Sequence, residues 1–336
     1  MLPYARHDIT PEDEAAVLAA LRSPTLTQGE GVERFETALA QHATTRTAVV
    51  VNSGTAALYL ALRATGCGPK TTVWTSPISF MATANAALLC GARIAFSDVE
   101  ATTGLVGGWV QPAQFFIPVT LGGQPITLTT AERQKTVIVD ACHGPLTLPV
   151  GALAACLSFH PAKHVACGEG GAILTNDETY AARCRMLRDH GRRPDKRMAT
   201  LSMNFRLPEL NCALGQSQLL RYDENVQRRQ DLALRYDQGL DGKVETVPHD
   251  PDSARHLYQI LVEDRDRVQE RLRDAGIGTA VHYPPIHLEP FYRSQLGFTS
   301  GMLPEAERFA SRTLSLPLYP TLTEREQDTI IGVLCG

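Results

Sequence analysis

Lys163 lies in the segment Ser158-Phe159-His160-Pro161-Ala162-Lys163-His164, shortly before the glycine-rich turn Gly168-Glu169-Gly170-Gly171. The apolar run Leu153–Leu157 precedes this segment, so the flanks of the lysine are largely apolar or small. Most lysines are solvated surface charges. A lysine in an apolar site has a lowered pKa, and its neutral amine is then a nucleophile and a proton carrier. Such an amine forms a Schiff base with an aldehyde, which would be the central chemistry of this protein.

An acid ends the apolar stretch Val137-Ile138-Val139-Asp140. A carboxylate at the C-terminal end of a buried strand points into the crevice where α/β sheets bind ligands. A buried carboxylate needs a cationic partner, and a protonated pyridine nitrogen would be one. The alternative for Asp140 is capping of the next turn. His143 follows three residues later, and either orients the acid, contacts the same ring or has a structural role.

The stretch Asn52-Ser53-Gly54-Thr55-Ala56-Ala57-Leu58 follows an expected strand and opens a helix. Small residues in such a turn expose backbone N–H groups at the positive end of the helix dipole, which suits a phosphate. Ordinary capping by Ser53 is the alternative.

A second strand-to-helix turn is Trp74-Thr75-Ser76-Pro77-Ile78-Ser79-Phe80. An aromatic ring at the opening of a helix in the same crevice can stack on a planar ligand. The alternative for Phe80 is a place in the core.

The elements that would position these residues alternate between strands and helices. The strand candidates are short, mostly rich in Val and Ile and not alternating, which indicates a sheet buried on both faces. The alternation predicts an α/β fold with a largely parallel sheet. We expect strands at 47–51, 72–75, 93–97, 115–119 and 136–140, and helices at 32–41, 55–64 and 80–90. Before them, Thr10, Pro11 and Asp13 predict a capped first helix.

A smaller unit is expected after Asp241-Gly242, where the sequence texture changes. A long helix with a break is expected at 208–234. The prediction is a large α/β domain over residues 1–240 and a small α+β domain over residues 241–336. In the small domain we expect strands at 256–262 and 279–283 and helices at 268–275, 305–313 and 324–334, the last with a capping box at Thr323 and Glu326.

The composition excludes several classes of protein. The net charge of −4 gives no basic face for nucleic acid or anionic membrane. No apolar run approaches about 18 residues, so no transmembrane helix is expected, and the first residues lack a signal-peptide pattern, so a cytoplasmic protein is expected. The eight cysteines form no C-x-x-C pair. We therefore expect reduced thiols, with neither a disulfide framework nor a metal site.

The four chemical segments, in this order, resemble the fold-type I pyridoxal-phosphate enzymes, whose fold is aspartate-aminotransferase-like. More closely, the chain resembles the DegT/StrS family of sugar-nucleotide aminotransferases over nearly its whole length. The resemblance also rests on Leu26-Thr27-Gln28-Gly29, Ala82-Thr83-Ala84-Asn85-Ala86 and Asn204-Phe205-Arg206-Leu207-Pro208-Glu209-Leu210-Asn211.

The resemblance implies a role for each matching residue. Lys163 would hold pyridoxal 5′-phosphate as a Schiff base and carry the proton. Asp140 would pair with the pyridine nitrogen, and Phe80 would stack on the ring. The phosphate would be held by Gly54, Thr55, Ala56 and Ser158.

Two further implied cofactor-binding residues are His143 and Asn204. His143 would lie beside the cofactor ring. Asn204 would reach the phosphate from the neighbouring subunit, which makes a homodimer the working unit.

Within the family the chain looks most like the pseudaminic-acid branch, on stretches such as Val281-His282-Tyr283-Pro284-Pro285-Ile286-His287. That likeness implies transfer of an amino group from L-glutamate to the 4-keto group of a UDP-linked 4-keto-6-deoxy-N-acetyl sugar, for a bacterial surface or flagellar glycan. The pyridoxamine form of the cofactor would carry the amino group between the two half-reactions. Candidates for binding the donor carboxylate or the nucleotide phosphates are Arg206, His160, His282 and His287.

Departures from the family keep other functions open. Residues 100–115, 144–155 and 190–202 look shortened, Ser202-Met203 replaces the usual glycine-tyrosine, and Pro145–Val150 is more apolar than expected. One alternative is an enzyme acting on another keto-sugar nucleotide, and another is a cofactor-binding homologue without turnover. A dehydratase is disfavoured, because those relatives carry histidine in place of Lys163.

Overall fold

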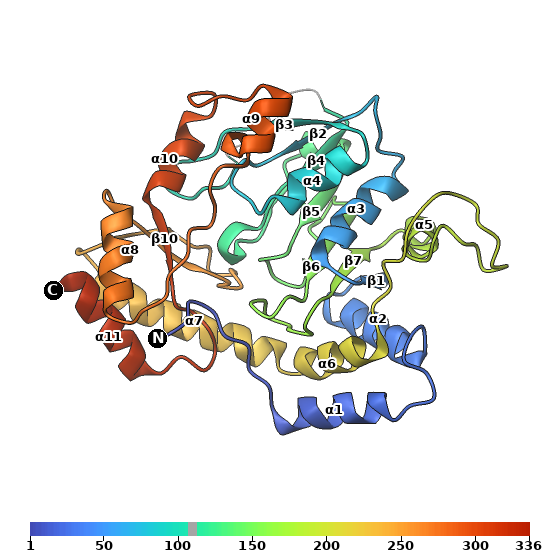
Figure 1. Cartoon of the computed structure of the whole chain (residues 1–336), viewed down its shortest axis with the longest axis horizontal. Coiled ribbons are helices and arrows are strands. Elements are labelled where there is room, and N and C mark those ends of the chain that lie inside the picture. Colours follow the sequence, from blue (N-terminus) through green and yellow to red (C-terminus); the bar gives the residue numbers. More distant parts are fainter. Residues whose placement is uncertain (107–112) are drawn as a thin grey trace.

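A seven-stranded sheet forms the centre of the larger part of the molecule, in the strand order β1-β7-β6-β5-β4-β2-β3 (Figure 1). The computed structural model describes residues 1–106 and 113–336, so part of the expected shortened region 100–115 lies outside the described residues. The strands are β1 (Thr47–Val51), β2 (Thr72–Thr75), β3 (Arg93–Phe96), β4 (Phe115–Ile117), β5 (Thr136–Asp140), β6 (Ala154–Ser158) and β7 (Gly171–Thr175).

The directions of these strands bring several carboxyl ends to one edge of the sheet. β5 pairs in parallel with β4 and β6, and β2 pairs in parallel with β3 and β4. β7 runs antiparallel to both of its neighbours, β1 and β6, so β1 and β6 are parallel to each other. The ends of β1, β2, β5 and β6 therefore meet at the edge where α/β sheets bind ligands. The expected largely parallel sheet is confirmed, with β7 as the reversed strand.

Helices cover both faces of this sheet, which explains why its strands read as continuous apolar runs. Val49 belongs to the core on one face and Val50 to the core on the other, as the two-residue period of a strand requires. The helices of the first core are α3 (Gly54–Ala64), α4 (Ala82–Leu89) and α5 (Glu178–Arg188). The second core contains α2 (Glu30–His42) and α6 (Glu209–Leu219), and α1 (Pro11–Leu21) packs on α6.

A three-stranded sheet in the order β10-β9-β8 lies at the other end of the molecule (Figure 1). The long helix α7 connects it to the larger sheet, and the expected break between α6 and α7 lies at Leu220-Arg221. The elements are α7 (Tyr222–Leu240), β8 (Glu245–Thr246), β9 (Tyr258–Leu261), α8 (Arg265–Asp274), α9 (Pro290–Leu296), α10 (Pro304–Arg312), β10 (Thr313–Leu316) and α11 (Glu324–Cys335). The domain division at residue 240 stays a prediction.

The local sequence signals predicted the two capped helix starts correctly and one strand wrongly. The capping boxes of Thr10 with Asp13 and of Thr323 with Glu326 are both present. The expected strand 279–283 is wrong, because only Ala280 forms a bridge, to Ser315 of β10. Thr313, expected to end a helix, instead begins β10.

Among the described residues, no helix is long and apolar enough to cross a membrane. All eight cysteines are free, as expected.

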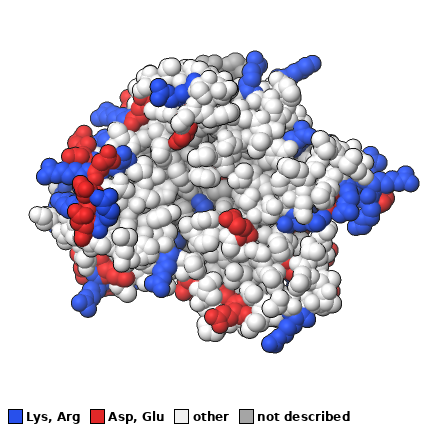
Figure 2. Space-filling view, viewed as in Figure 1, with Lys and Arg blue, Asp and Glu red and all other residues white. Residues whose placement is uncertain are grey.

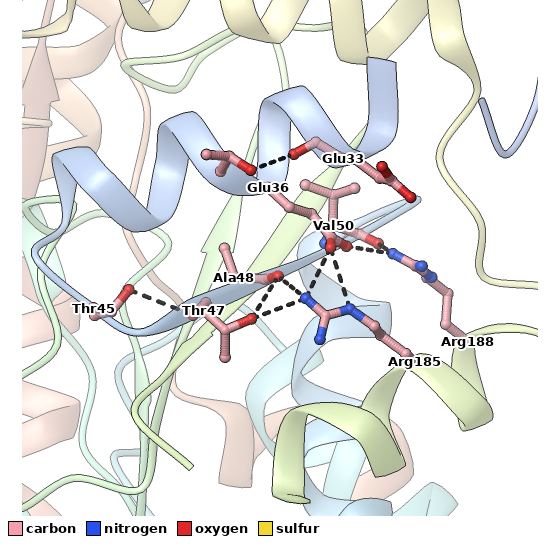
Figure 3. A network of polar contacts seen from close by, with 9 residues as sticks. Glu33, Glu36, Thr45, Thr47, Ala48, Val50, Arg185 and Arg188 are labelled. Carbon is pink, nitrogen blue, oxygen red and sulfur yellow. Dashed lines mark hydrogen bonds and ion pairs between the residues drawn. The ribbon is translucent and has the colours of Figure 1, made fainter. Parts of the chain in front are cut away.

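A buried ionic network protects the outer edge of β1, which leads into the Asn52–Leu58 turn (Figure 3). Glu36 of α2 accepts a hydrogen bond from Val50 N at 3.0 Å and forms ion pairs with Arg185 and Arg188 of α5, at 2.9 and 2.6 Å. The two arginines also donate to the carbonyls of Ala48 and Val50, at 2.9 and 2.8 Å. An edge strand normally leaves backbone N–H and C=O groups unpaired, and here side chains form hydrogen bonds with them.

We expect Glu36→Ala to lower the free energy of unfolding by about 3 kcal/mol, because removing one partner of a buried pair leaves the other charges and Val50 N unsatisfied. Urea unfolding at a fixed protein concentration measures this change. Glu33→Ala, on the exposed face of the same helix, is the matched control and should change it by less than about 0.5 kcal/mol. Equal losses in the two variants would contradict the importance of the network.

Candidate active site

A cavity of about 420 Å³ lies at the edge where the strand ends converge. Four segments of the large sheet reach it, each following a different strand: Ser53–Thr55 after β1, Ser79 and Phe80 after β2, Asp140–His143 after β5 and Ser158–Lys163 after β6. The residues singled out in the sequence as separate motifs are thus brought together. The opposite side of the cavity is formed by residues from elsewhere in the chain, Tyr4, His256, His282 and Tyr283.

Asp140 is buried, with 5% of its surface exposed, and its carboxylate is held by two donors. Thr83 Oγ1 donates to Oδ2 at 2.6 Å, and the backbone N–H of Cys142 donates to Oδ1 at 3.2 Å. Ser79 Oγ lies 2.7 Å from Thr83 Oγ1, so Ser79 can donate to Thr83 while Thr83 donates to the acid. The carboxylate is therefore fixed in orientation and lines the cavity as an anion that can receive a cationic partner.

Lys163 enters the same cavity from the turn after β6, and its backbone N–H donates to His160 O at 2.8 Å. Burial lowers the pKa of its amine to about 8, although the negative charge of Asp140 acts in the other direction. Arg229, buried beneath the cavity, contributes to the lowering. A substantial fraction of the Lys163 amine is thus neutral near pH 8, which is the state a nucleophile or proton acceptor needs.

The first turn of α3 and the end of β6 form a tight cradle. Ser53 caps the helix by accepting from Ala56 N at 3.1 Å, so the Ala56 amide is already engaged. Thr55 is exposed at the cavity, and Ser158 lines it from the other side. A Cβ added at Gly54 would lie 2.9 Å from Ser158 Cβ, which only glycine avoids. Backbone amides at a helix start, beside a hydroxyl, suit a phosphate group.

Imidazole and phenol rings from several parts of the chain also line the cavity. His143 Nε2 lies 3.0 Å from the Tyr283 hydroxyl, and its ring is 4.3 Å from that of His256. Burial lowers the pKa of both His143 and His256 well below the usual range, and that of His282 to about 4. These imidazoles are therefore neutral at neutral pH. His143 Nδ1 is buried and has no hydrogen-bond partner among the described residues.

The remaining predicted residues divide into those at the cavity and those away from it. Phe80 lines the cavity with 53% of its surface exposed, and its ring is 6.1 Å from that of Tyr283. His160 and His282 also line it. Asn204 lies outside the lining, with Oδ1 accepting from Arg206 N at 3.0 Å.

Two of the suggested substrate-binding residues are engaged elsewhere. Arg206 forms an ion pair with Asp189. His287 is fully buried, with Nε2 3.1 Å from Glu307 Oε1.

Sequence reasoning missed several residues that line or support the cavity. Thr83 was noticed only as part of a resemblance, and its position one turn after Ser79 was the available signal. Tyr4 and His256 carry no local signal, because their segments reach the cavity only through long-range packing.

Comparison with known proteins identifies the family. The model of the DegT/DnrJ/EryC1/StrS aminotransferase family matches residues 7–335. The chain belongs to this family. A relative is the UDP-4-amino-4,6-dideoxy-N-acetyl-beta-L-altrosamine transaminase of Campylobacter jejuni subsp. jejuni serotype O:23/36, which is 31% identical over 99% of this chain and 98% of its own.

Two solved structures share the fold. Helicobacter pylori PseC, an aminotransferase involved in the biosynthesis of pseudoaminic acid, has a TM-score of 0.91, 28% identity and coverage of 99% and 98% of the two chains. Bacillus subtilis NtdA, solved with bound cofactor PMP (pyridoxamine 5′-phosphate), has a TM-score of 0.88, 30% identity and coverage of 97% and 82%. The expected fold-type I architecture and the expectation of a pyridoxal-phosphate-dependent aminotransferase are confirmed.

The cavity of this aminotransferase fits that cofactor at both ends. The cradle at Gly54, Thr55 and Ser158 offers a helix start and a hydroxyl, which suit a phosphate. The buried carboxylate of Asp140 suits a protonated ring nitrogen, and Lys163 lines the same cavity. The individual roles of these residues stay predictions.

We expect Thr83→Val to slow the half-reaction with a fixed amino donor about tenfold, because a hydrogen bond to a charged group is lost. The rate of the cofactor absorbance change in rapid mixing measures this. Thr83→Ser keeps the hydroxyl and is the control. If Val and Ser variants react equally fast, the hydrogen bond to Asp140 is unimportant for the reaction.

The lowered pKa of Lys163 predicts its reactivity in the cofactor-free protein. Below about pH 8 the amine is protonated and unreactive, and above about pH 8 it is neutral. The rate of acylation of Lys163 should therefore rise with pH, with a midpoint near pH 8. Peptide mapping by mass spectrometry follows the adduct, with N-acetyl-lysine amide, midpoint about 10.4, as the reference. A midpoint equal to that of the reference would show that the site does not perturb Lys163.

Proposed function

We propose that this enzyme transfers an amino group from L-glutamate to the 4-keto group of a nucleotide-linked 4-keto-6-deoxy-N-acetyl sugar, with UDP as the nucleotide. The similarity to a transaminase named for a UDP-linked 4-amino sugar, over 98% of that protein, supports the substrate class. The likeness to PseC supports the same branch. The product would enter the biosynthesis of a bacterial surface or flagellar glycan.

The observation that carries the proposal is the pairing of Asp140 with Lys163 in one cavity. β5 and β6 are adjacent and parallel, so the acid at the end of one strand and the lysine after the other share a single edge. Fixed donors hold the acid, and burial leaves the lysine amine readily deprotonated. Two such groups in one cavity support the proposal that an anion and a proton carrier act on one small ligand.

The bound cofactor supplies an electron sink for the α-carbon of the amino donor. The carboxylate of Asp140, held by Thr83 and the Cys142 amide, would pair with a protonated ring nitrogen. The Lys163 amine, when neutral, would take the proton from the donor α-carbon and hold it for return during the transfer. The neutral imidazoles of His143 and His282 add no competing positive charge beside this amine.

We further propose that the working unit is a homodimer in which residues 189–204, here called the arm, reach the neighbouring cavity. The arm is a hairpin held by bridges such as Asp189–Asn204, and it projects beyond α5 (Figure 1). It exposes apolar surface, with Met198 69%, Leu201 79% and Met203 59% exposed, as residues that pack on a partner do.

The arm carries positive charges of the kind that a bound diphosphate needs. No arginine is found among the described residues that line the cavity, although a diphosphate needs cationic partners. Figure 2 shows Lys and Arg gathered at the end of the molecule where the arm projects. In the described part of the chain, Arg193, Lys196 and Arg197 form no ion pair, and Asn204 lies at the base of the same arm.

The function is tested with purified enzyme in its pyridoxal form, mixed separately with L-glutamate and with UDP-4-amino-4,6-dideoxy-N-acetyl-β-L-altrosamine. We expect each amine to convert the cofactor to the pyridoxamine form, and Lys163→Ala to abolish both conversions. The absorbance spectrum gives the rates, and mass spectrometry identifies the keto products. Conversion by glutamate but not by the amino sugar would show that the acceptor is a different keto compound.

A further inference from the structure

The segment Leu2–Tyr4 is attached to the smaller sheet's end of the molecule and yet reaches the active site. Leu2 N donates to Gly276 O and Leu2 O accepts from Gly278 N, both at 2.7 Å. Tyr4 O accepts from Leu318 N at 3.2 Å. Backbone hydrogen bonds on both sides thus fix the segment, so the position of Tyr4 is set by the part of the chain that follows residue 275.

The Tyr4 side chain lines the cavity beside His282, with the two ring centres 5.5 Å apart. Its surface is only partly buried, and its hydroxyl makes no hydrogen bond among the described residues. His282 is held in turn by Ser315 Oγ, 2.9 Å from its Nδ1. Tyr4 therefore offers the cavity an aromatic face and a phenol group on a rigid support.

The proposed reacting groups come from a different part of the chain. Lys163, Asp140 and the cradle at Gly54 all follow strands of the large sheet. Both half-reactions take place at these groups, so a small amino acid needs only this inner part of the cavity. A nucleotide-linked sugar is much larger and has to extend across to the wall that carries Tyr4. A tyrosine suits a sugar, because its ring packs on the C–H face and its hydroxyl can bind a polar substituent.

We propose that Tyr4 is a specificity-determining residue that contacts the sugar of the nucleotide-linked substrate and makes no contact with the amino-acid donor. The proposal rests on the proposed function, and it adds a residue that selects between the two substrates. It predicts that the two half-reactions respond differently to one substitution.

The experiment compares two amines that react with the same pyridoxal form of the full-length enzyme. L-glutamate is the small probe and UDP-4-amino-4,6-dideoxy-N-acetyl-β-L-altrosamine is the large one. In Tyr4→Ala we expect the half-saturating concentration of the amino sugar to rise about tenfold, which is the upper range for an aromatic contact. The rate and half-saturation for glutamate should stay within about twofold of the wild type.

Two variants separate the sugar contact from a structural effect. Tyr4→Phe keeps the ring and should retain most of the affinity for the amino sugar, whereas Tyr4→Leu fills the space without a ring and should behave like Tyr4→Ala. Tyr4→Leu also replaces Tyr4→Ala if the alanine variant does not fold. His7→Ala, exposed on the same N-terminal stretch and outside the cavity lining, is the control for the segment.

The possible outcomes separate the inference about Tyr4 from the proposed function. An unchanged half-saturation for the amino sugar in Tyr4→Ala and Tyr4→Leu overturns the inference and leaves the proposed function intact. Equal losses for glutamate and the amino sugar also overturn it, because Tyr4 would then only support the fold. A wild-type enzyme that reacts with glutamate but not with the amino sugar overturns the proposed function, and the inference falls with it.

Discussion

The buried carboxylate of Asp140 is the constraint around which the active site is organised. A charge with 5% of its residue surface exposed has to be compensated by donors and by a cation. Thr83 and the Cys142 amide supply the donors, and Ser79 supports Thr83. These partners come from the turn after β2, from helix α4 that follows it and from the turn after β5, so the acid links segments that follow two strands. What they leave open is the direction toward the cavity, where a protonated ring nitrogen fits.

The topology of the sheet also positions the active-site residues, through strands farther from Asp140. Strand β7 lies between β1 and β6 and runs antiparallel to both, so β1 and β6 point the same way. The cradle after β1 and the lysine after β6 therefore lie at one edge of the sheet. Because β1 is at the border of the sheet, its outer polar groups would be open to solvent or to another strand. The Glu36 network of α2 and α5 satisfies them. The position of the phosphate cradle thus depends on an ionic cluster outside the cavity.

The sequence allowed the inner wall of the site to be predicted but not the outer one. Asp140 and the Ser53–Ala56 turn each lie at the end of a predicted strand, and Lys163 follows the apolar run Leu153–Leu157, which overlaps β6. The common edge of parallel strands brings them together. Tyr4 and His256 reach the cavity through packing between segments far apart in the chain, which no local pattern encodes. Residues 279–283 have strand-like composition, yet the chain pairs there only through Ala280 and then brings His282 and Tyr283 into the cavity.

The two walls differ in charge as well as in origin. Burial keeps the histidines at the cavity neutral, both His143 after β5 and His256 and His282 of the outer wall. A protonated histidine beside the amine would lower the pKa of Lys163 further, as Arg229 does, so the neutral imidazoles leave burial as the main cause of the lowered pKa. Among the described residues that line the cavity, Lys163 is present but no arginine, so the diphosphate of the proposed nucleotide substrate has no arginine partner there. In the proposed homodimer, cations from the arm of a second copy would supply that charge, and Lys163 would be left to move the proton.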